Sequence, residues 1–329
     1  MIAPPAAFRV VEPADVDSAM AAHEGGPGSR YLGGGTDLLV NLRRGLGSPS
    51  LLIDLRGIAE LEGLACKAGG ARIGAGVTLA RIAADPELRA RYPALCEAAG
   101  VVAGPAHRNV ATVAGNLCLD TRCIYYNQSE WWRGANAYCL KYRGDVCHVA
   151  PQGQHCHAAF CGDLAPALLV LGASIEVAGR AGRRRMPLAE LYREDGLAHL
   201  TLAAGELVVA VELPADPPPS AYAKVRVRGS VDFPLAGVAV ALRAEEGKLA
   251  ALRVALTGTN SRPFLLDGTG DLLGRPLDAD VLQQLDRLVQ KQVQPMRTTL
   301  LQSNYRRVVA AVLARRLAAR LVATQQVAR

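Results

Sequence analysis

The stretch YLGGGTDLL, residues 31–39, joins a strand-like segment to a helix-like segment through three consecutive glycines. Glycine lets the backbone approach an anion and point its N–H groups at it, and the N-terminus of the following helix adds a favourable dipole. The hydroxyl of Thr36 supplies one more donor. The pattern matches neither the G-x-G-x-x-G nor the P-loop motif. It therefore favours a phosphate-binding turn of another kind, and taken alone it fits a plain structural turn equally well.

A second polar stretch of small residues, RNVATVAGN, lies at residues 108–116 and is suited to line the other side of a pyrophosphate. Around these two stretches the pattern alternates between short strands and helices. We expect strands at 8–13 (FRVVEP, ended by Pro13), 51–55 and 71–76, a hairpin at 173–187, and helices at 16–22, 79–84, 86–100 and 163–172.

Length and composition predict two domains with a sizeable core, because the chain has 329 residues, of which 50% are hydrophobic and 20% charged. The run Asp216-Pro217-Pro218-Pro219 marks the boundary, since three prolines cannot continue a helix or a central strand. Strands of an antiparallel sheet are predicted after it, at 222–228, 235–242 and 252–256, followed by helices at 279–293 and 303–322. In the last helix an apolar stripe with arginines opposite predicts a core or subunit contact through Tyr305, Val308, Val309, Val312, Leu313 and Leu317.

The charge balance indicates an anionic partner rather than nucleic acid. Lysine and arginine exceed aspartate and glutamate by 37 − 30 = 7, but the excess is spread out and only 5% of the residues are aromatic, which disfavours base stacking. We interpret Arg183-Arg184-Arg185 as an exposed hairpin arm. No apolar stretch is long enough to span a membrane and no secretory signal is visible, so we expect a cytoplasmic protein that binds no membrane.

Six of the eight cysteines fall within the 44 residues from Cys118 to Cys161. They occupy a segment, about 117–160, that has little periodicity and is too long for an ordinary connection, which indicates a functional loop. In a large chain without a signal peptide such a group favours a metal ion or an iron–sulfur cluster over disulfides. Zinc sites usually show paired C-x₂₋₄-C knuckles, whereas Cys123, Cys139, Cys147 and Cys156 are separated by 15, 7 and 8 residues, and wide spacing is compatible with a cluster wrapped by a loop. Ligation by His148, His155 or His157 stays open, although we favour hydrogen-bonded surface groups.

Together these motifs resemble the FAD-binding subunit of the molybdenum hydroxylase (xanthine dehydrogenase) family. The resemblance rests on YLGGGTDLL at 31–39, LLIDL at 51–55, RIGAGVTLA at 72–80, NVATVAGNL at 109–117, GDLAPALLVLGA at 162–173, GELVVAVELP at 205–214 and YAKVRVRGSVDF at 222–233. It implies an α+β fold with a two-lobed, PCMH-like FAD-binding domain over 1–215 and a smaller α+β domain over 216–329 with an antiparallel sheet and C-terminal helices.

The resemblance also implies which residues hold the cofactor. The pyrophosphate would lie on Leu32, Gly33, Gly34, Gly35, Thr36 and Asp37, and the second loop near the diphosphate and ribityl chain would be Thr112, Val113, Ala114, Gly115 and Asn116. Asp163 would be an acidic ligand of the flavin, Lys224 a cation near its ring, and Val102 and Val208 apolar contacts. Ala114 stands where many relatives have glycine.

The cysteine loop, with CIYYNQSEWWR at 123–133, resembles that of 4-hydroxybenzoyl-CoA reductase β subunits, which carry an extra [4Fe–4S] cluster. This resemblance implies Cys123, Cys139, Cys147 and Cys156 as cluster ligands and leaves Cys118 and Cys161 as neighbours, although spacing alone does not exclude either as a ligand. The aromatic residues of the loop, Tyr125, Tyr126, Trp131, Trp132, Tyr138 and Tyr142, are expected to supply buried apolar mass around it.

What the resemblance implies for function is an electron-transfer subunit without catalytic residues of its own. Its partners would be a molybdenum-cofactor subunit and a [2Fe–2S] subunit in a heterotrimer, paired as a dimer of trimers. A ferredoxin-like donor would pass electrons through [4Fe–4S] and FAD to the [2Fe–2S] clusters and molybdenum, where 4-hydroxybenzoyl-CoA becomes benzoyl-CoA.

Two alternatives remain at this stage. One is the FAD subunit of another molybdenum hydroxylase, acting on a purine, nicotinate or carbon monoxide, with a different metal in the cysteine loop. The other, from a different class, is a zinc-stabilised interaction protein that carries no flavin.

Overall fold

The computed structural model describes residues 7–26 and 28–327. Its helices are α1 (Val16–Glu24), α2 (Leu38–Arg43), α3 (Leu79–Ala84), α4 (Pro86–Arg91), α5 (Pro93–Val101), α6 (Pro105–Arg108), α7 (Val113–Leu117), α8 (Glu130–Ala135), α9 (Leu164–Val170), α10 (Ala279–Gln292) and α11 (Ser303–Val327). Its strands are β1 (Arg9–Val11), β2 (Arg30–Leu32), β3 (Leu51–Asp54), β4 (Leu64–Lys67), β5 (Gly70–Gly74), β6 (Ser174–Gly179), β7 (Gly182–Pro187), β8 (Leu207–Leu213), β9 (Ser220–Val225), β10 (Ala236–Glu245), β11 (Lys248–Thr257) and β12 (Phe264–Leu265).

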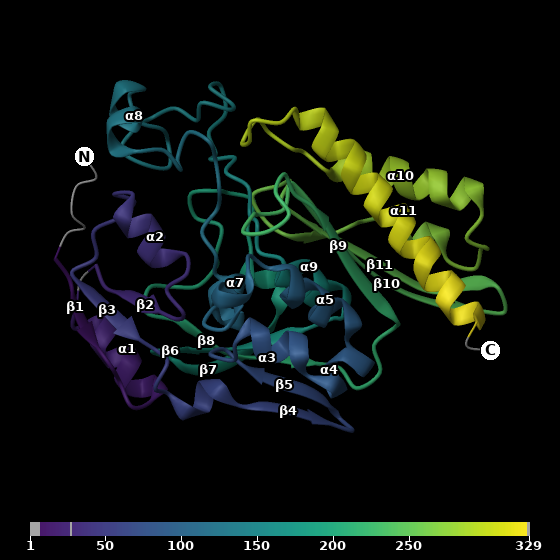
Figure 1. Ribbon diagram of the computed structural model, residues 1–329, viewed down its shortest axis with the longest axis horizontal. Coiled ribbons are helices and arrows are strands. Elements are labelled where there is room, and N and C mark those ends of the chain that lie inside the picture. The colour runs from purple at the N-terminus through teal and green to yellow at the C-terminus, as the bar shows by residue number, and fades with distance from the viewer. Residues whose placement is uncertain (1–6, 27, 328–329) are drawn as a thin grey trace.

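The first lobe is a small parallel sheet in the order β1-β3-β2, with α1 packed against it (Figure 1). Its central strand β3 is buried along its whole length, because Leu51, Leu52 and Ile53 face neighbours on both sides of the sheet. The glycine turn leaves the carboxyl end of β2 and enters α2. Ligands of open parallel sheets bind at this end of the strands.

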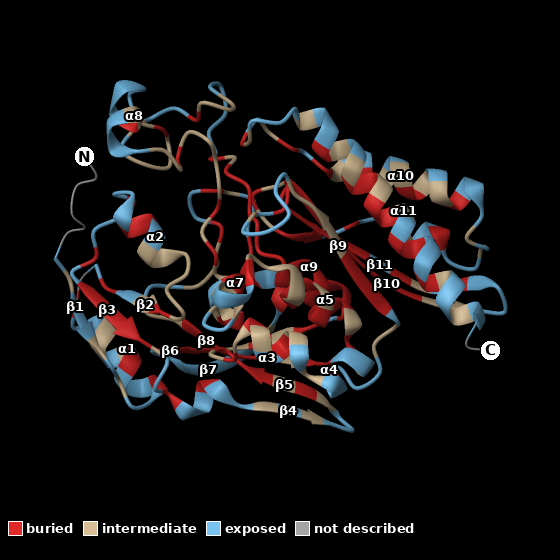
Figure 2. Cartoon of the chain, in the orientation of Figure 1, coloured by how far each residue is buried: buried red, intermediate tan, exposed pale blue. Residues whose placement is uncertain are grey.

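The second lobe is a five-stranded antiparallel sheet in the order β4-β5-β8-β6-β7, and short helices cover one of its faces. α9 is buried in every residue and forms the centre of the largest apolar core (Figure 2). The arginine hairpin is exposed as expected, since Arg183 and Arg184 on β7 form ion pairs with Glu60, Glu176 and Glu206 on the surface.

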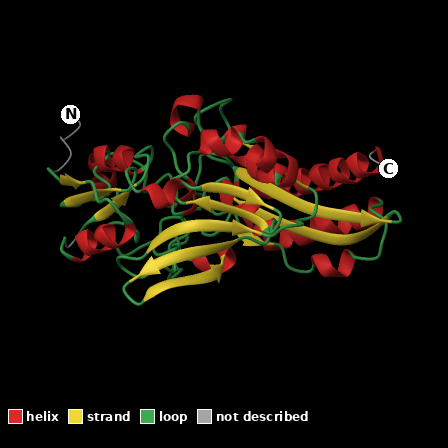
Figure 3. Cartoon of the chain, turned by 90° about the horizontal axis from the view of Figure 1, so that it is seen from below, coloured by secondary structure: helices red, strands yellow, loops and turns green. Residues whose placement is uncertain are grey.

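The C-terminal part is an antiparallel sheet in the order β12-β11-β10-β9, with α10 and α11 packed on it. Figure 3 shows the parallel sheet of the first lobe at one end of the molecule and the long strands β10 and β11 towards the other. The predicted α+β class, with an antiparallel sheet and C-terminal helices in the second part of the chain, is confirmed.

Two predictions about helices need correction. The expected helix over 86–100 is interrupted, because Pro93 disfavours the helical conformation at Tyr92, and α4 and α5 are separate. The predicted apolar stripe of α11 is confirmed in part, since Leu313 and Leu317 are buried in the core. Tyr305 and Val308 are exposed instead, and Arg306 is buried beside Ala310. Arg306 is buried because its guanidinium donates to carbonyl oxygens from outside the helix.

The cysteine loop, residues 117–160, protrudes above the first two lobes and contains α8 (Figure 1). It is anchored below by the pairing of Arg122 with Ala159 and, beside α11, by a bond from the amide of Ile124 to the carbonyl of Thr298. Within residues 7–26 and 28–327, no helix is long and apolar enough to cross a membrane.

Candidate functional site

The glycine turn offers unpaired backbone donors. Within the described residues, the amide groups of Gly34, Gly35 and Thr36 donate no hydrogen bond to the protein. Gly35 has a φ of +70°, a conformation that glycine adopts without the strain of a side chain. Free N–H groups at the start of a helix suit a pyrophosphate, so the chemistry of this turn fits the predicted cofactor.

The two predicted loops are in direct contact. A Cβ atom added to Gly34 would lie 1.8 Å from the carbonyl oxygen of Val110, and one added to Gly33 would lie 2.8 Å from Oγ1 of Thr112. Such distances are far below van der Waals contact, so glycine is required where the first loop crosses the second. The structure therefore brings together two segments that are about 75 residues apart in the sequence.

The second loop is held by the sheet beneath it. The amides of Val113 and Ala114 donate to the carbonyls of Val77 and Ala75, and the Thr112 hydroxyl accepts from the amide of Gly115 as the N-cap of α7. These amides are already paired, in contrast to those of the glycine turn. Ala114 keeps this pairing, so alanine at this position does not disturb the loop.

Asn116 connects the second loop to Asp163. Its side-chain oxygen accepts a hydrogen bond from the amide of Leu164, 3.0 Å away, at the start of α9. Asp163 is 2% exposed and accepts from the Tyr222 hydroxyl at 2.6 Å and from Nζ of Lys224 at 3.0 Å. Burial raises the pKa of Asp163, while Lys224 and Tyr222 oppose that rise. The acid and the cation predicted from sequence thus form one buried ion pair.

The two predicted apolar contacts lie in different surroundings. Val208 is 3% exposed in β8, where it pairs with Val177 in the interior of the sheet. Val102 ends α5 and is half-buried, with its carbonyl accepting from Arg108.

The four predicted cysteine ligands surround one cavity. It is lined by Cys123, Cys139, Cys147 and Cys156 together with Tyr125, Tyr126, Leu140, Lys141, His148, Val149 and Ala158. Cys139, Cys147 and Cys156 are each less than 9% exposed. Cys118 and Cys161, although part of the same run of cysteines, are not among the described residues that line it.

Two thiols of this cavity, Cys123 and Cys156, are protonated at neutral pH. All eight cysteines of the chain are free, and burial raises the pKa of Cys123 to about 11 and that of Cys156 to about 12. Neutral buried thiols are poor nucleophiles, and a bound metal would deprotonate them. These two thiols are therefore unsuited to nucleophilic catalysis.

A single metal ion does not fit the thiols as they are placed. Within the described ranges, no group of three or more Cys, His, Asp or Glu side chains is arranged to hold one. His148 lines the cavity, but its ring nitrogen is hydrogen-bonded to the carbonyl of Tyr138. This favours its interpretation as a hydrogen-bonded side chain.

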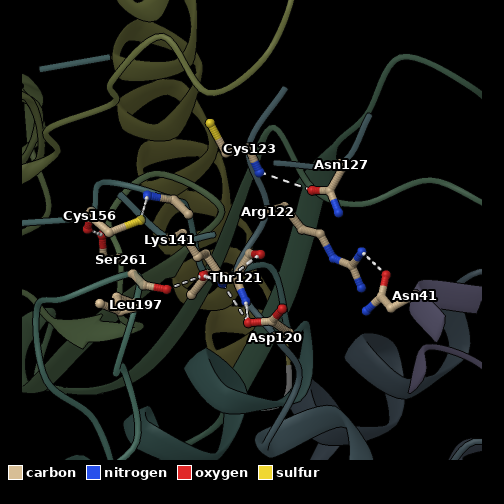
Figure 4. A network of polar contacts seen from close by, with 12 residues as sticks. Asn41, Asp120, Thr121, Arg122, Cys123, Asn127, Lys141, Cys156, Leu197 and Ser261 are labelled. Atoms are coloured by element: carbon tan, nitrogen blue, oxygen red, sulfur yellow. Dashed lines mark hydrogen bonds and ion pairs between the residues drawn. The ribbon is translucent and has the colours of Figure 1, made fainter. Parts of the chain in front are cut away.

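Buried cations were missed by sequence reasoning. Arg122 leaves the loop next to Cys123 and reaches the glycine turn, where it pairs with Asp37 and donates to Oδ1 of Asn41 (Figure 4). Its Nε atom is buried and meets no acceptor in the part of the chain that the structure describes. Arg133 is 1% exposed and donates to the carbonyls of Arg44 and Gly45. The signal available was only their place within the cysteine loop.

The aromatic residues of the loop contribute less buried area than expected. Tyr126 is buried and packs with Cys139 and Leu46, but Trp131 is 80% exposed on α8. The prediction that Trp131 shields the centre is wrong, because the short helix α8 turns this side chain outward.

Comparison with known proteins places both parts of the chain. Residues 6–216 match the family described as FAD binding domain in molybdopterin dehydrogenase, and residues 220–321 match the CO dehydrogenase flavoprotein C-terminal domain. The aldehyde oxidoreductase FAD-binding subunit PaoB of Escherichia coli is 34% identical over 77% of this chain and 81% of its own length. The carbon monoxide dehydrogenase medium chain of Afipia carboxidovorans is 26% identical over 88% of each chain.

Solved structures agree over nearly the whole length. A structure of the Cu,Mo-CO dehydrogenase aligns with a TM-score of 0.79 at 25% identity, covering 97% of this chain and 99% of that one. Quinoline 2-oxidoreductase from Pseudomonas putida aligns with a TM-score of 0.76 at 24% identity, which shows the shared fold.

Proposed function

Because this chain belongs to the FAD-binding medium subunits of the molybdenum hydroxylase family, we propose that it is an electron-transfer subunit that holds both FAD and a [4Fe–4S] cluster. FAD would lie across the two loops, on residues 32–37 and 112–116, with the Asp163–Lys224 pair and the two valines, Val102 and Val208, beside it. When bound, the two groups would supply electron transfer. The chain's own residues bind them and exclude water.

The glycine turn supports the FAD assignment through its charge as well as its donors. Asp37 would repel a pyrophosphate, but its carboxylate is paired with Arg122 and accepts from the side-chain amide of Asn41 at 3.0 Å. Because the charge of Asp37 is balanced, the partial positive charges of the unpaired amide groups make the electrostatic potential at the turn positive.

One observation carries the cluster assignment: the four predicted ligands, taken from positions 123 to 156, line one cavity while the other two cysteines of the run do not. Four thiolates suit either Zn²⁺ or a [4Fe–4S] cluster. The resemblance of the cysteine loop to that of subunits with an extra [4Fe–4S] cluster supports the cluster rather than zinc.

We further propose that the assembled enzyme is a 4-hydroxybenzoyl-CoA reductase. Two electrons and two protons would convert the substrate to benzoyl-CoA and water on a molybdenum subunit, with a [2Fe–2S] subunit between, in a dimer of heterotrimers supplied by a ferredoxin-like donor. The resemblance of the cysteine loop supports this assignment. Aldehyde oxidation is the second candidate, favoured by the 34% identity to an aldehyde oxidoreductase subunit.

The experiment that tests the cofactors is quantification of iron, zinc and flavin in the anaerobically purified chain. We expect about four irons and one FAD per chain, the numbers that one such cluster and one flavin require. Cys139→Ser should lose iron and keep FAD, whereas Cys161→Ser, a cysteine outside the cavity, should keep both. Zinc in place of iron, or iron loss in Cys161→Ser alone, would overturn the ligand assignment.

The substrate is tested separately in the complete enzyme. Purified with its partner subunits and a reduced low-potential donor, it should form benzoyl-CoA from 4-hydroxybenzoyl-CoA. Oxidation of aromatic aldehydes without that activity would instead establish the second candidate and leave the cofactor proposal standing.

A further inference from the structure

We propose that the buried ion pair of Lys141 and Asp120 sets the reduction potential of the cluster held by the cysteine loop, Lys141 raising it and Asp120 lowering it. This rests on the proposed function, because it concerns the cluster assigned there. It assigns a positioning role to two side chains that bind neither FAD nor iron.

Lys141 belongs to the wall of the cluster cavity. It lines the same cavity as the four cysteines, and it lies two residues after Cys139 in a tight turn closed by a bond from the amide of Tyr142 to the carbonyl of Cys139. Cys156, which lies on the other arm of the loop, lines the same cavity as Lys141. Lys141 thus lines one cavity with ligands from two parts of the chain, and Figure 4 shows its ammonium group bound to Asp120 and Thr121.

The position of this charge is fixed. The Lys141 side chain is 5% exposed, and its Nζ atom donates to Oδ1 of Asp120 at 2.6 Å and to the carbonyl and hydroxyl oxygens of Thr121. The ammonium also lies over the ring of Tyr126, 4.6 Å from its centroid. A cation held by this many partners does not move away when the charge of its surroundings changes.

A cation in this place stabilises the reduced cluster more than the oxidised one. Four thiolates give a [4Fe–4S] cluster a net negative charge, and reduction adds one further negative charge. In a poorly solvated site the attraction between a cation and that added charge is only weakly screened, so the cation raises the reduction potential. Hydrogen bonding and charge around the sulfurs are known means of tuning such centres.

Asp120 lowers the reduction potential of the cluster, and its charge interacts with the cluster more weakly than that of Lys141. Its carboxylate is 34% exposed, so water screens it more than it screens Lys141. Its Oδ1 atom also accepts from the amide of Thr121, which keeps it in place when Lys141 is replaced. Removing each charge separately should therefore shift the potential in opposite directions, a result that loosened packing does not produce.

The experiment is a reductive titration of the anaerobically purified, iron-loaded full chain, in which the signal of the reduced cluster in electron paramagnetic resonance is followed against potential. For Lys141→Met we expect the ratio of reduced to oxidised cluster at a fixed potential to fall at least tenfold, which corresponds to a potential lower by about 59 mV for one electron. For Asp120→Asn we expect a smaller rise. The double variant should lie between the two.

Lys248→Met is the matched control, because it removes an exposed lysine charge at the start of β11 in the C-terminal sheet. Its potential should equal that of the unmodified chain. Unchanged potentials in Lys141→Met and Asp120→Asn, or shifts of the same sign, would overturn the inference while iron and FAD content left the proposed function intact. If Lys141→Met fails to retain iron, Asp120→Asn decides: a raised potential supports the inference and an unchanged one overturns it.

Discussion

The glycine turn and the cysteine loop are both irregular segments, yet they are built by opposite means. The turn, residues 33–37, lies between a strand and a helix and relies on the absence of side chains where it crosses the second loop. The cysteine loop has little regular structure and relies on long buried side chains, Arg122, Arg133 and Lys141, that reach backbone or acidic partners. The conformation of the glycine turn depends on the absence of side chains, whereas that of the cysteine loop depends on buried cations that find hydrogen-bond or ion-pair partners.

This difference predicts how each region fails. A turn that depends on close approach should lose its ligand when one methyl group is added, with little tolerance. A loop held by hydrogen bonds from buried cations should lose stability when one cation is removed, since its charge-assisted hydrogen bonds are lost.

Gly34→Ala should have the largest effect. The new Cβ would lie 1.8 Å from the carbonyl oxygen of Val110, so the two loops must separate and the pyrophosphate site is lost. We expect the purified chain to contain little FAD, measured by its absorption and by extraction. Gly57→Ala, where a Cβ meets nothing within 4 Å, should keep a full complement. Stoichiometric FAD in Gly34→Ala would refute the steric account of the turn.

Arg133→Met tests the cysteine loop. Arg133 is 1% exposed and donates to the carbonyls of Arg44 and Gly45 and to Glu130, so its removal breaks charge-assisted bonds made by a buried guanidinium. We expect the free energy of unfolding in urea to fall by about 3 kcal/mol, as for loss of charge-assisted buried bonds.

The neighbouring Arg143 provides the control for that measurement. It contacts the same Glu130 carboxylate, but its side chain is 61% exposed. Arg143→Met should change the free energy of unfolding by less than about 0.5 kcal/mol. Equal effects of the two substitutions would mean that burial of the cation is not what holds the loop.

The sequence predicted the turn well and the loop only in part, for a physical reason. Gly33, Gly34 and Gly35 are adjacent in sequence, so a local pattern identified the turn, and cysteine is distinctive enough to mark the cavity. The sequence predicts that Arg306 is a solvated charge on a helix. In the structure Arg306 is buried, because its guanidinium donates to the carbonyls of Leu235 and Met296, which belong to other segments. The hydrogen-bond partners of a buried cation come from distant parts of the chain, so a local sequence pattern does not predict them.

A pH effect is expected next to the loop, at His199. Burial lowers the pKa of His199 to about 4, and its Nε2 atom has no hydrogen-bond partner among the described residues. The unfolded chain binds a proton near pH 6.5 and the folded chain does not, so stability is full above that pH and falls as pH decreases towards 4. Between pH 7 and 5 the loss should be about 2 kcal/mol.

The variant His199→Leu should flatten this dependence in urea unfolding measured at both pH values. An undiminished loss in the variant would assign the pH dependence to other groups. A flattened pH dependence in His199→Leu would show that the neutral, buried ring of His199 contributes to stability next to the cysteine loop.

Arg122→Met has the smallest expected effect and is the most direct test of the comparison, because Arg122 belongs to both regions. It leaves the cysteine loop beside Cys123 and neutralises Asp37 in the glycine turn, with its guanidinium 4.6 Å from the centroid of the Phe233 ring. Without it the Asp37 carboxylate would repel the pyrophosphate, so we expect FAD affinity to weaken about tenfold, or about 1.4 kcal/mol. Iron content should not change, since Arg122 is not among the cavity-lining residues. Asp37→Asn in the same background removes the unbalanced charge and should restore most of the affinity, measured by flavin fluorescence on titration of the apo chain. If it restores none, Arg122 acts by holding the two regions together rather than by charge, and the loop and the turn form one structural unit.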